Sequence, residues 1–354
     1  PDAKFDNSGV CSLCNSFKPN KSRVDEYFRS PDDLSELIKT IKQRRRGDYD
    51  ALVLLSGGKD STYTLSKLVD LGLKVYAFSL DNGYISDQAK QNIDYVCSKL
   101  GVAHHYGTTP HMNSIFTDSL ARYSEVCHGC FKTIYNLSLE FAAKHSIDYI
   151  FTGLSRGQLF ETRLNNELFS ECSLPLEKID DMVQAARVQY HAIKDAPNTL
   201  LGIEAANDGT LASQISIVDF YRYYDVELSD MLDYLKSRVG WIRPMDTGRS
   251  TNCLINDVGI HVHKLERGFH NYSLPYSWDV RLGHKKRDAA LEELDDSIDE
   301  ENVESILKEI GYSPKMLQPG GGKLHAYYTG SPDLDQEGLT NWLSERLPDY
   351  MQPV

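Results

Sequence analysis

Short apolar runs alternate with amphipathic stretches in the first half of the chain. Between the runs, apolar residues recur every three or four positions, as on one face of a helix. Buried strands that alternate with amphipathic helices are typical of a parallel sheet with helices on both faces. The sequence therefore predicts a doubly wound α/β domain. The runs that predict its strands are residues 51–55, 74–80, 102–106 and 148–153.

The other segments are less regular. Residues 31–46 predict a helix, residues 155–250 are mostly helical in pattern, and the acidic stretch 288–309 predicts a further helix. His261 and His263 alternate as they would on one face of a strand. Such a pair is either a metal site or an ordinary half-exposed strand face, and we favour the second interpretation.

A glycine turn follows the first predicted strand, in the segment SGGKDS (residues 56–61). Gly57 and Gly58 permit a tight turn and let backbone N–H groups approach an anion. The start of the next helix adds partial positive charge, Lys59 adds a full charge, and Asp60 is suited to hold Mg²⁺. The turn therefore fits a pyrophosphate or triphosphate group. Further hydroxyl donors are Ser56, Ser61 and Thr62.

This segment contains neither of two common nucleotide fingerprints, G-x-x-x-x-G-K-[ST] and G-x-G-x-x-G. It matches S-G-G-x-D-S and resembles the PP-loop (HUP-type) ATP pyrophosphatases, also called adenine nucleotide alpha-hydrolases. The resemblance implies a five-stranded domain that cleaves ATP to AMP and pyrophosphate and places the AMP on a substrate oxygen. It also implies that Leu80, Asp81 and Gly153, at the ends of later strands, help to hold the adenosine.

Seven cysteines occur in the chain, and four of them form two Cys-x-x-Cys pairs. In a sequence without an apparent secretion signal, this pattern favours metal or redox chemistry over disulfides. Cys11 and Cys14 lie in a short polar segment, which predicts a small Zn²⁺-binding knuckle over residues 1–30. Two cysteines cannot fill a tetrahedral zinc site. Either other residues supply ligands or the knuckle is truncated, and we favour truncation.

The second pair, Cys127 and Cys130, opens a predicted helix, whose start lowers the pKa of a thiol. This placement resembles the tRNA 2-thiouridine sulfurtransferases, in which such a pair and a distant third cysteine carry an iron–sulfur cluster or a persulfide. The resemblance implies Cys253 as the third cysteine, with Cys172 as the alternative, around a [4Fe-4S] cluster. A closed Zn²⁺ site or two buried thiols are the other interpretations.

The flanking segments point to a different chemistry. AKFDNSGVCSLC (residues 3–14) and DVRLGHKKRDAALEEL (residues 279–294) resemble the N-acetyl sugar amidotransferases, PP-loop enzymes that convert an acetamido group to an acetamidino group with ammonia. This resemblance implies a partner glutaminase and purely structural cysteines. We predict a sulfurtransferase, with a sulfur donor such as a cysteine desulfurase, and keep the amidotransferase as the alternative.

The last segment, KLHAYYTGSPDLDQEGLTNWLSERLPDYMQPV (residues 323–354), resembles the small C-terminal subdomain of nonribosomal peptide synthetase adenylation domains. We therefore expect a chain fused to, or excised from, a larger synthetase. The expected parts are the knuckle, residues 1–30; the PP-loop domain, residues 31–295, with a helical insertion around 160–250; and a small α+β piece, residues 296–354.

The charge of the chain limits the range of partners. Acidic residues outnumber basic ones by 51 to 38, and the formal net charge is −13. Nucleic-acid affinity depends on Lys and Arg that neutralise phosphates, so we expect a small-molecule or carrier-bound substrate and no nucleic acid. The apolar runs are too short to span a bilayer, and no signal peptide is apparent. We expect a cytoplasmic enzyme with no membrane partner.

Overall fold

The computed structural model describes residues 4–28, 30–164, 166–170, 174–244, 252–295 and 297–314. Two sequence-based expectations concern residues outside these ranges. Cys172, the alternative third cysteine, is one of them. The segment that resembles an adenylation subdomain is the other.

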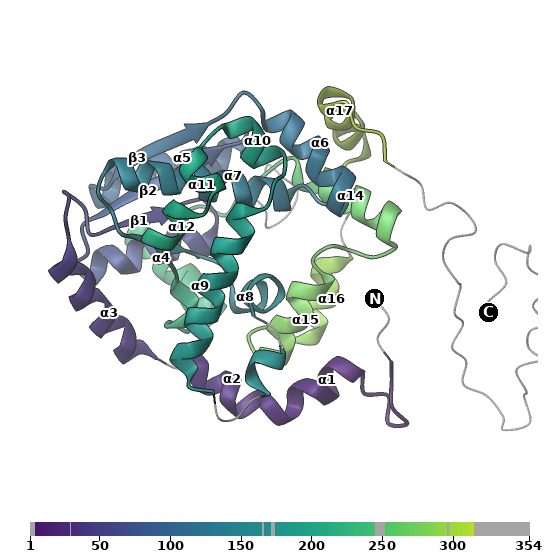
Figure 1. Cartoon of the computed structure of the whole chain (residues 1–354). Coiled ribbons are helices and arrows are strands. Elements are labelled where there is room, and N and C mark those ends of the chain that lie inside the picture. Colours follow the sequence, from purple (N-terminus) through teal and green to yellow (C-terminus); the bar gives the residue numbers. More distant parts are fainter. Residues whose placement is uncertain are drawn as a thin grey trace, which may run out of the picture.

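A five-stranded parallel sheet forms the centre of the molecule (Figure 1). Its order is β3-β2-β1-β4-β5, so the chain builds outward from β1 to β3 and then returns to the other side of β1. This reversal creates a switch point between β1 and β4, where α/β sheets bind ligands beyond the carboxyl ends of the strands. The prediction of a doubly wound α/β domain is confirmed. The strands are β1 (Ala51–Leu54), β2 (Val75–Asp81), β3 (Ala103–Thr108), β4 (Tyr149–Thr152) and β5 (Ser216–Asp219).

The fifth strand lies inside the region that was expected to be a helical insertion. Its four residues pair in parallel with β4, for example Ile150 with Ile217 and Phe151 with Val218. A segment of four residues is too short for its apolar pattern to distinguish a strand from a buried helical turn. The described residues between 160 and 244 therefore form a set of helices that includes the edge strand of the sheet.

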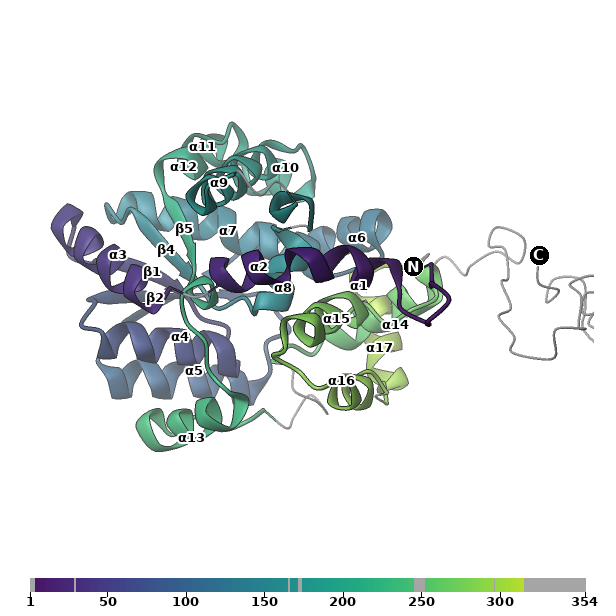
Figure 2. The same ribbon diagram turned by 90° about the horizontal axis from the view of Figure 1, so that it is seen from below.

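Helices cover both faces of the sheet (Figure 2). One face carries α3 (Pro31–Arg44), α4 (Lys59–Asp70), α5 (Asp87–Leu100) and α13 (Leu228–Val239). The other face carries α7 (Cys127–Lys144), α9 (Leu176–Ala192), α10 (Ala196–Leu201), α11 (Glu204–Asn207) and α12 (Thr210–Gln214).

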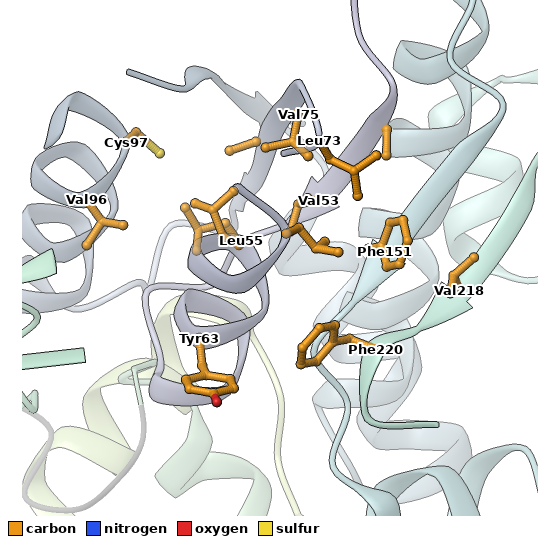
Figure 3. Packing of buried hydrophobic residues seen from close by; sticks show 14 of the residues in the cluster. Val53, Leu55, Tyr63, Leu73, Val75, Val96, Cys97, Phe151, Val218 and Phe220 are labelled. Atoms are coloured by element: carbon orange, nitrogen blue, oxygen red, sulfur yellow. The ribbon is translucent and has the colours of Figure 1, made fainter. Parts of the chain in front are cut away.

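The central strand is anchored from both faces. Val53 and Leu55 pack in the cluster on the α4 side, which also contains Phe151 (Figure 3). Leu52 and Leu54 point the opposite way, as the pleat requires, and pack on the α7 side. Each fully buried side chain of this size contributes about 1.5–3 kcal/mol. The end of β1, where the glycine turn begins, is therefore held rigidly.

Two further apolar clusters assemble the remaining helices. One joins α6 (Met112–Tyr123), α14 (Asn256–Arg267) and α17 (Glu300–Ile310). The other joins α1 (Ser12–Phe17), α2 (Lys21–Tyr27), α8 (Arg156–Thr162) and α15 (Ser273–Leu282), and α15 also contacts α16 (Arg287–Leu294). Short 3-10 turns are Lys18–Asn20, Asn166–Phe169 and Phe220–Arg222. No helix in the described ranges has both the length and the apolar character needed to cross a bilayer.

Two expectations about local structure are wrong. Residues 259–264 belong to α14 and do not form a strand. Positions two residues apart in a helix differ by about 200° about the axis, so His261 and His263 share neither the predicted strand face nor a helix face. The acidic stretch 288–309 contains two helices, α16 and α17, in place of one.

A buried ion pair fixes α7 to the segment before α10. The Lys132 side chain has no exposed surface, and its Nζ lies 2.7 Å from both the Asp195 carboxylate and the Ile193 carbonyl oxygen. Burial lowers the pKa of Lys132, against the opposing effect of Asp195. The cation also lies 5.2 Å from the centre of the Tyr190 ring. The Lys132 ammonium group is therefore held by the Asp195 carboxylate, the Ile193 carbonyl oxygen and the Tyr190 ring.

We expect Lys132→Met to destabilise the protein by about 3–5 kcal/mol, because it leaves the Asp195 carboxylate buried without its partner. Lys39→Met is the matched control. Its ion pair with Glu36 has a similar length, 2.6 Å, but both side chains are largely exposed, so its loss should cost about 0–1 kcal/mol. Urea unfolding measures both values, and a similar small change in the two variants would contradict the assigned role of Lys132.

Candidate nucleotide site

The glycine turn connects β1 directly to α4. Gly57 has a φ of +78°, a left-handed conformation that favours glycine. A β-carbon at Gly57 would lie 2.5 Å from the carbonyl oxygen of Ala89 on α5. The backbone conformation and the available space therefore both require glycine at this position.

Gly153, which follows β4, limits the turn from the other side of the switch point. A β-carbon at Gly153 would lie 2.8 Å from the Cα atom of Ser61 and 2.9 Å from its nitrogen. Only a hydrogen atom fits between the end of β4 and the start of α4. This close approach places the first N–H groups of α4 at the switch point.

The amides of the turn are available to an anion. Neither Gly57 nor Gly58 donates its N–H group to an acceptor in the part of the chain that the structure describes. The first turn of α4 adds N–H groups that have no acceptor within the helix, together with the positive end of the helix dipole. The backbone therefore fits a phosphate or pyrophosphate group.

The side chains of the turn form a polar group around these amides. The Nζ atom of Lys59 lies 2.6 Å from Oδ2 of Asp60. Burial would lower the pKa of Lys59, but the Asp60 carboxylate outweighs this effect and raises it, so the lysine is a cation at neutral pH. The Ser61 hydroxyl accepts the N–H group of Ser56 at 3.1 Å and lies 3.0 Å from the Ser56 hydroxyl.

A cavity of about 780 Å³ opens at the turn and reaches α14, α15 and α16. Three predicted nucleotide-binding residues, Gly57, Thr62 and Asp81, do not line it: Thr62 is buried, and Asp81 pairs with Lys90 at 3.0 Å. Asn82 lines the cavity in place of Asp81. The predicted nucleotide-binding residues that do line it are Ser56, Gly58, Lys59, Asp60, Ser61, Leu80 and Gly153.

The structure brings three distant cysteines to the same cavity. Cys127 and Cys130 lie in the first turn of α7, and Cys253 lies in the loop before α14. The side-chain amide of Asn82 donates to the sulfur atoms of Cys130, at 3.6 Å, and Cys253, at 3.4 Å. Cys253 also forms an isolated antiparallel bridge with Ile85. The end of β2 therefore holds two of the three sulfur atoms in place.

These cysteines pack against apolar residues of α6, α14 and α17. Burial raises the pKa of Cys130 to about 12 and raises the pKa values of Cys127 and Cys253 as well. The expectation that the start of α7 lowers these pKa values is wrong, because the loss of hydration outweighs the partial charge of the helix. Within the described ranges, no three His, Cys, Asp or Glu side chains are arranged to hold a metal ion. Zinc or a cluster at these cysteines stays a prediction.

The first cysteine pair lies away from this cavity, at the start of α1. The Cys11 sulfur accepts the N–H group of Cys14 at 3.4 Å and a guanidinium N–H of Arg281 at 3.6 Å. Burial acts to raise the pKa of Cys11, but these donors outweigh it and lower the pKa to about 7. The segment is helical and packs on α8 and α15. Among the described residues no metal-binding group includes this pair, so Zn²⁺ at Cys11 and Cys14 is still only predicted.

Residues of α15 and of the α15–α16 segment also line the cavity, and no role was predicted for them from the sequence. Asp279 accepts the N–H group of Gly157 at 2.8 Å, and Lys285 pairs with Glu293 at 2.6 Å. Their sequence signal was the segment 279–294, which carried a family resemblance but no assigned roles. Its spacing does not reveal which of its charged side chains face the cavity.

The fold, the turn and its amides fit the PP-loop class of ATP pyrophosphatases. The family model described as queuosine biosynthesis protein QueC matches residues 50–136, from the start of β1 into α7. A 7-cyano-7-deazaguanine synthase from Marinomonas sp. is 35% identical over 69 residues, which are 20% of this chain and 32% of that protein. The chain belongs to the PP-loop ATP pyrophosphatase superfamily and is an ATP-dependent enzyme.

Two other proteins resemble a larger part of the chain more distantly. An uncharacterized protein of Methanocaldococcus jannaschii is 22% identical over 305 residues, 82% of this chain and 87% of that protein. The structure of NMN synthetase from Francisella tularensis has a TM-score of 0.39 and 12% identity over 76% of this chain and 90% of its own. A structural likeness at that level carries no functional argument.

We expect Gly57→Ala to weaken the binding of Mg²⁺-ATP by about tenfold or more. The added β-carbon must displace the turn from α5, and the strain of about 1–3 kcal/mol that this causes is lost from the binding free energy. Gly101→Ala is the control. Gly101 also has a positive φ, +65°, but a β-carbon there would meet no atom within 4 Å. Calorimetric titration should show normal nucleotide affinity for the control, and an equal affinity of both variants would contradict the geometry of the turn.

Asp279 should make stability depend on pH. Burial raises its pKa from 3.8 to about 6, against the opposing effects of the Gly157 N–H group and Lys285. Between these values the folded state binds more protons than the unfolded chain, so the free energy of unfolding falls as pH rises from about 4 to about 6. Asp279→Asn keeps an acceptor for the Gly157 N–H group but does not titrate. In this variant we expect the free energy of unfolding to lack the fall of about 3 kcal/mol over this pH range. Parallel pH profiles of wild type and variant in urea unfolding would refute this.

Proposed function

We propose that the protein is an ATP-dependent sulfurtransferase, which adenylates a substrate oxygen and then replaces that oxygen with sulfur. The observation that supports this proposal is the convergence of Cys127, Cys130 and Cys253 on the cavity at the PP-loop. Thiols have no evident use in the release of pyrophosphate. Their position at the same cavity favours a second step in which sulfur displaces AMP.

The turn serves the first step. The amides of Gly57 and Gly58 and the hydroxyl of Ser61 receive the phosphates that leave as pyrophosphate. Asp60 is a carboxylate suited to Mg²⁺, which when bound neutralises phosphate oxygens. The Lys59–Asp60 pair opens for this purpose, and the freed ammonium group stabilises the charge that develops during adenylyl transfer.

The second step is proposed to use a persulfide, because a persulfide requires no metal-binding arrangement. Its terminal sulfur attacks the adenylated carbon and expels AMP. A second thiol then attacks the enzyme-bound sulfur, which releases the thiolated product and leaves a disulfide that an external thiol reduces. Cys130 and Cys253, which share the Asn82 amide as donor, are the pair that we assign to this disulfide.

The acceptor that we propose is a small or carrier-bound molecule in a peptide or secondary-metabolite pathway. The net charge of −13 supports this choice over tRNA. The resemblance of residues 323–354 to an adenylation subdomain supports a link to peptide assembly. The sulfur comes from a separate donor protein, such as a cysteine desulfurase.

A second candidate function is the transfer of ammonia from a partner glutaminase. The observation that favours it is the packing of the three half-buried thiols against apolar residues, which raises their pKa values and makes them poor nucleophiles. In that case the adenylation step is unchanged and ammonia displaces the AMP. The cysteines then stabilise the packing of α7 against α14 and carry no sulfur.

Sulfur loading distinguishes the two candidates. We expect the anaerobically purified chain, incubated with a cysteine desulfurase and [³⁵S]cysteine, to retain label that dithiothreitol removes. The double variant Cys130→Ala/Cys253→Ala should lose this label. Iron, zinc and sulfide analysis of the same samples tests for a metal or cluster.

Cys97→Ala is the matched control for this experiment. Cys97 is buried, whereas the cavity cysteines are half-buried, and it lies on α5 in the cluster of the sheet, away from the cavity, so its variant should load as the wild type does. A metal-free wild type that retains no label would exclude the sulfurtransferase and leave the ammonia-transferring candidate. Production of ADP and phosphate in place of AMP and pyrophosphate would exclude both.

A further inference from the structure

Two side chains from late in the chain hold the carbonyl groups of the PP-loop. The indole Nε1 of Trp241 donates to the Gly57 carbonyl oxygen at 2.8 Å, and the side-chain amide of Asn252 donates to the Ser56 carbonyl oxygen. Trp241 is buried, and both residues line the cavity. The donors lie 184 and 196 residues from their acceptors, so neither contact is a local turn interaction.

The geometry of the peptide bond converts these contacts into a constraint on the amides. In a planar trans peptide, the C=O of one residue and the N–H of the next point in opposite directions. A donor on the Ser56 carbonyl therefore fixes the direction of the Gly57 N–H, and a donor on the Gly57 carbonyl fixes that of the Gly58 N–H. These are the two amides that have no acceptor among the described residues.

Helix α5 holds Trp241 in turn. Asn92 on α5 accepts the N–H group of Ile242 at 3.1 Å and donates to the carbonyl oxygen of the same residue at 2.6 Å. The Ala89 carbonyl, one turn earlier on α5, occupies the space that a side chain at Gly57 would need. Helix α5 thus restricts the conformation of the turn in two ways: by direct contact at Gly57, and by holding the segment that contains Trp241.

We propose that Trp241 and Asn252 are positioning residues that orient the amides of the PP-loop for the phosphates of the nucleotide. Glycine peptides rotate easily, and without these donors each peptide plane would have to be reoriented as the ligand binds. Donors that are already aligned with the developing charge cost no reorganisation. The two residues act on the recognition of pyrophosphate and leave the recognition of adenosine unaffected.

The test uses inorganic pyrophosphate and adenosine as separate probes of the full chain in the presence of Mg²⁺. Trp241→Phe keeps an aromatic ring but lacks the donor, and Asn252→Leu lacks the donor at a less buried position. Each loses one neutral hydrogen bond, so we expect the Kd for pyrophosphate to rise about three- to tenfold. The Kd for adenosine should stay within about twofold of the wild-type value, since adenosine carries no phosphate for the oriented amides to bind.

Trp278→Phe is the control, because the ring of Trp278 packs against Phe17 and Phe160 and not against the turn. It should bind both probes normally. Unchanged pyrophosphate affinity in both donor variants would overturn the proposal. Equal weakening of pyrophosphate and adenosine would also overturn it, since that result indicates general damage to the site. No cysteine is involved, so the outcome is independent of the sulfurtransferase proposal.

Discussion

The structure depends on a group of peptide N–H donors at the end of a buried strand that have no acceptor among the described residues. Buried backbone amides almost always have a hydrogen-bond partner, so free ones persist only where the surrounding structure prevents the turn from collapsing. The Ala89 carbonyl limits the turn at Gly57, and Gly153, which follows β4, lies against Ser61 at the start of α4. Trp241 holds a carbonyl of the turn. The free amides are therefore a property that the fold maintains.

The order of the strands explains why the turn lies at this place. β1 is central, with β2 on one side and β4 on the other, and both neighbours are parallel to it. Side chains of β1 alternate between two apolar clusters, so the strand is fixed from both faces. The chain leaves β1 and β4 in different directions, which opens the space between their ends. A flexible turn on an edge strand would lack this support.

The parts of the structure that the sequence predicted are those with strong local patterns. The segment from Ser56 to Ser61 carries its chemistry in consecutive residues, and β1, β2 and β4 are largely apolar runs that alternate with helices. The period of residues 259–264 was misread as a strand because two alternating histidines in a short segment fit either structure. β5 is too short to give a period of its own.

The features that could not be predicted depend on contacts between distant segments. Trp241 and Asn252 are single residues with no motif around them, and only the folded chain shows that both reach the same turn. The pKa values of the thiols follow from burial against α6, α14 and α17, which a helix-start rule does not include. The convergence of Cys253 with the second pair was predicted from a family resemblance, and spacing alone would not have identified it.

The end of β2 connects the two halves of the cavity. Leu80, which resemblance assigns to the adenosine, and Asn82, whose amide contacts two cysteine sulfurs, are two residues apart, and both line the cavity. The sulfur atoms of Cys130 and Cys253 therefore lie close to the segment that resemblance assigns to the adenosine. The half of the cavity at the turn is polar and suits phosphate, whereas the half around the cysteines is lined by apolar residues. This division of one cavity is what any second step, with sulfur or with ammonia, requires of the structure.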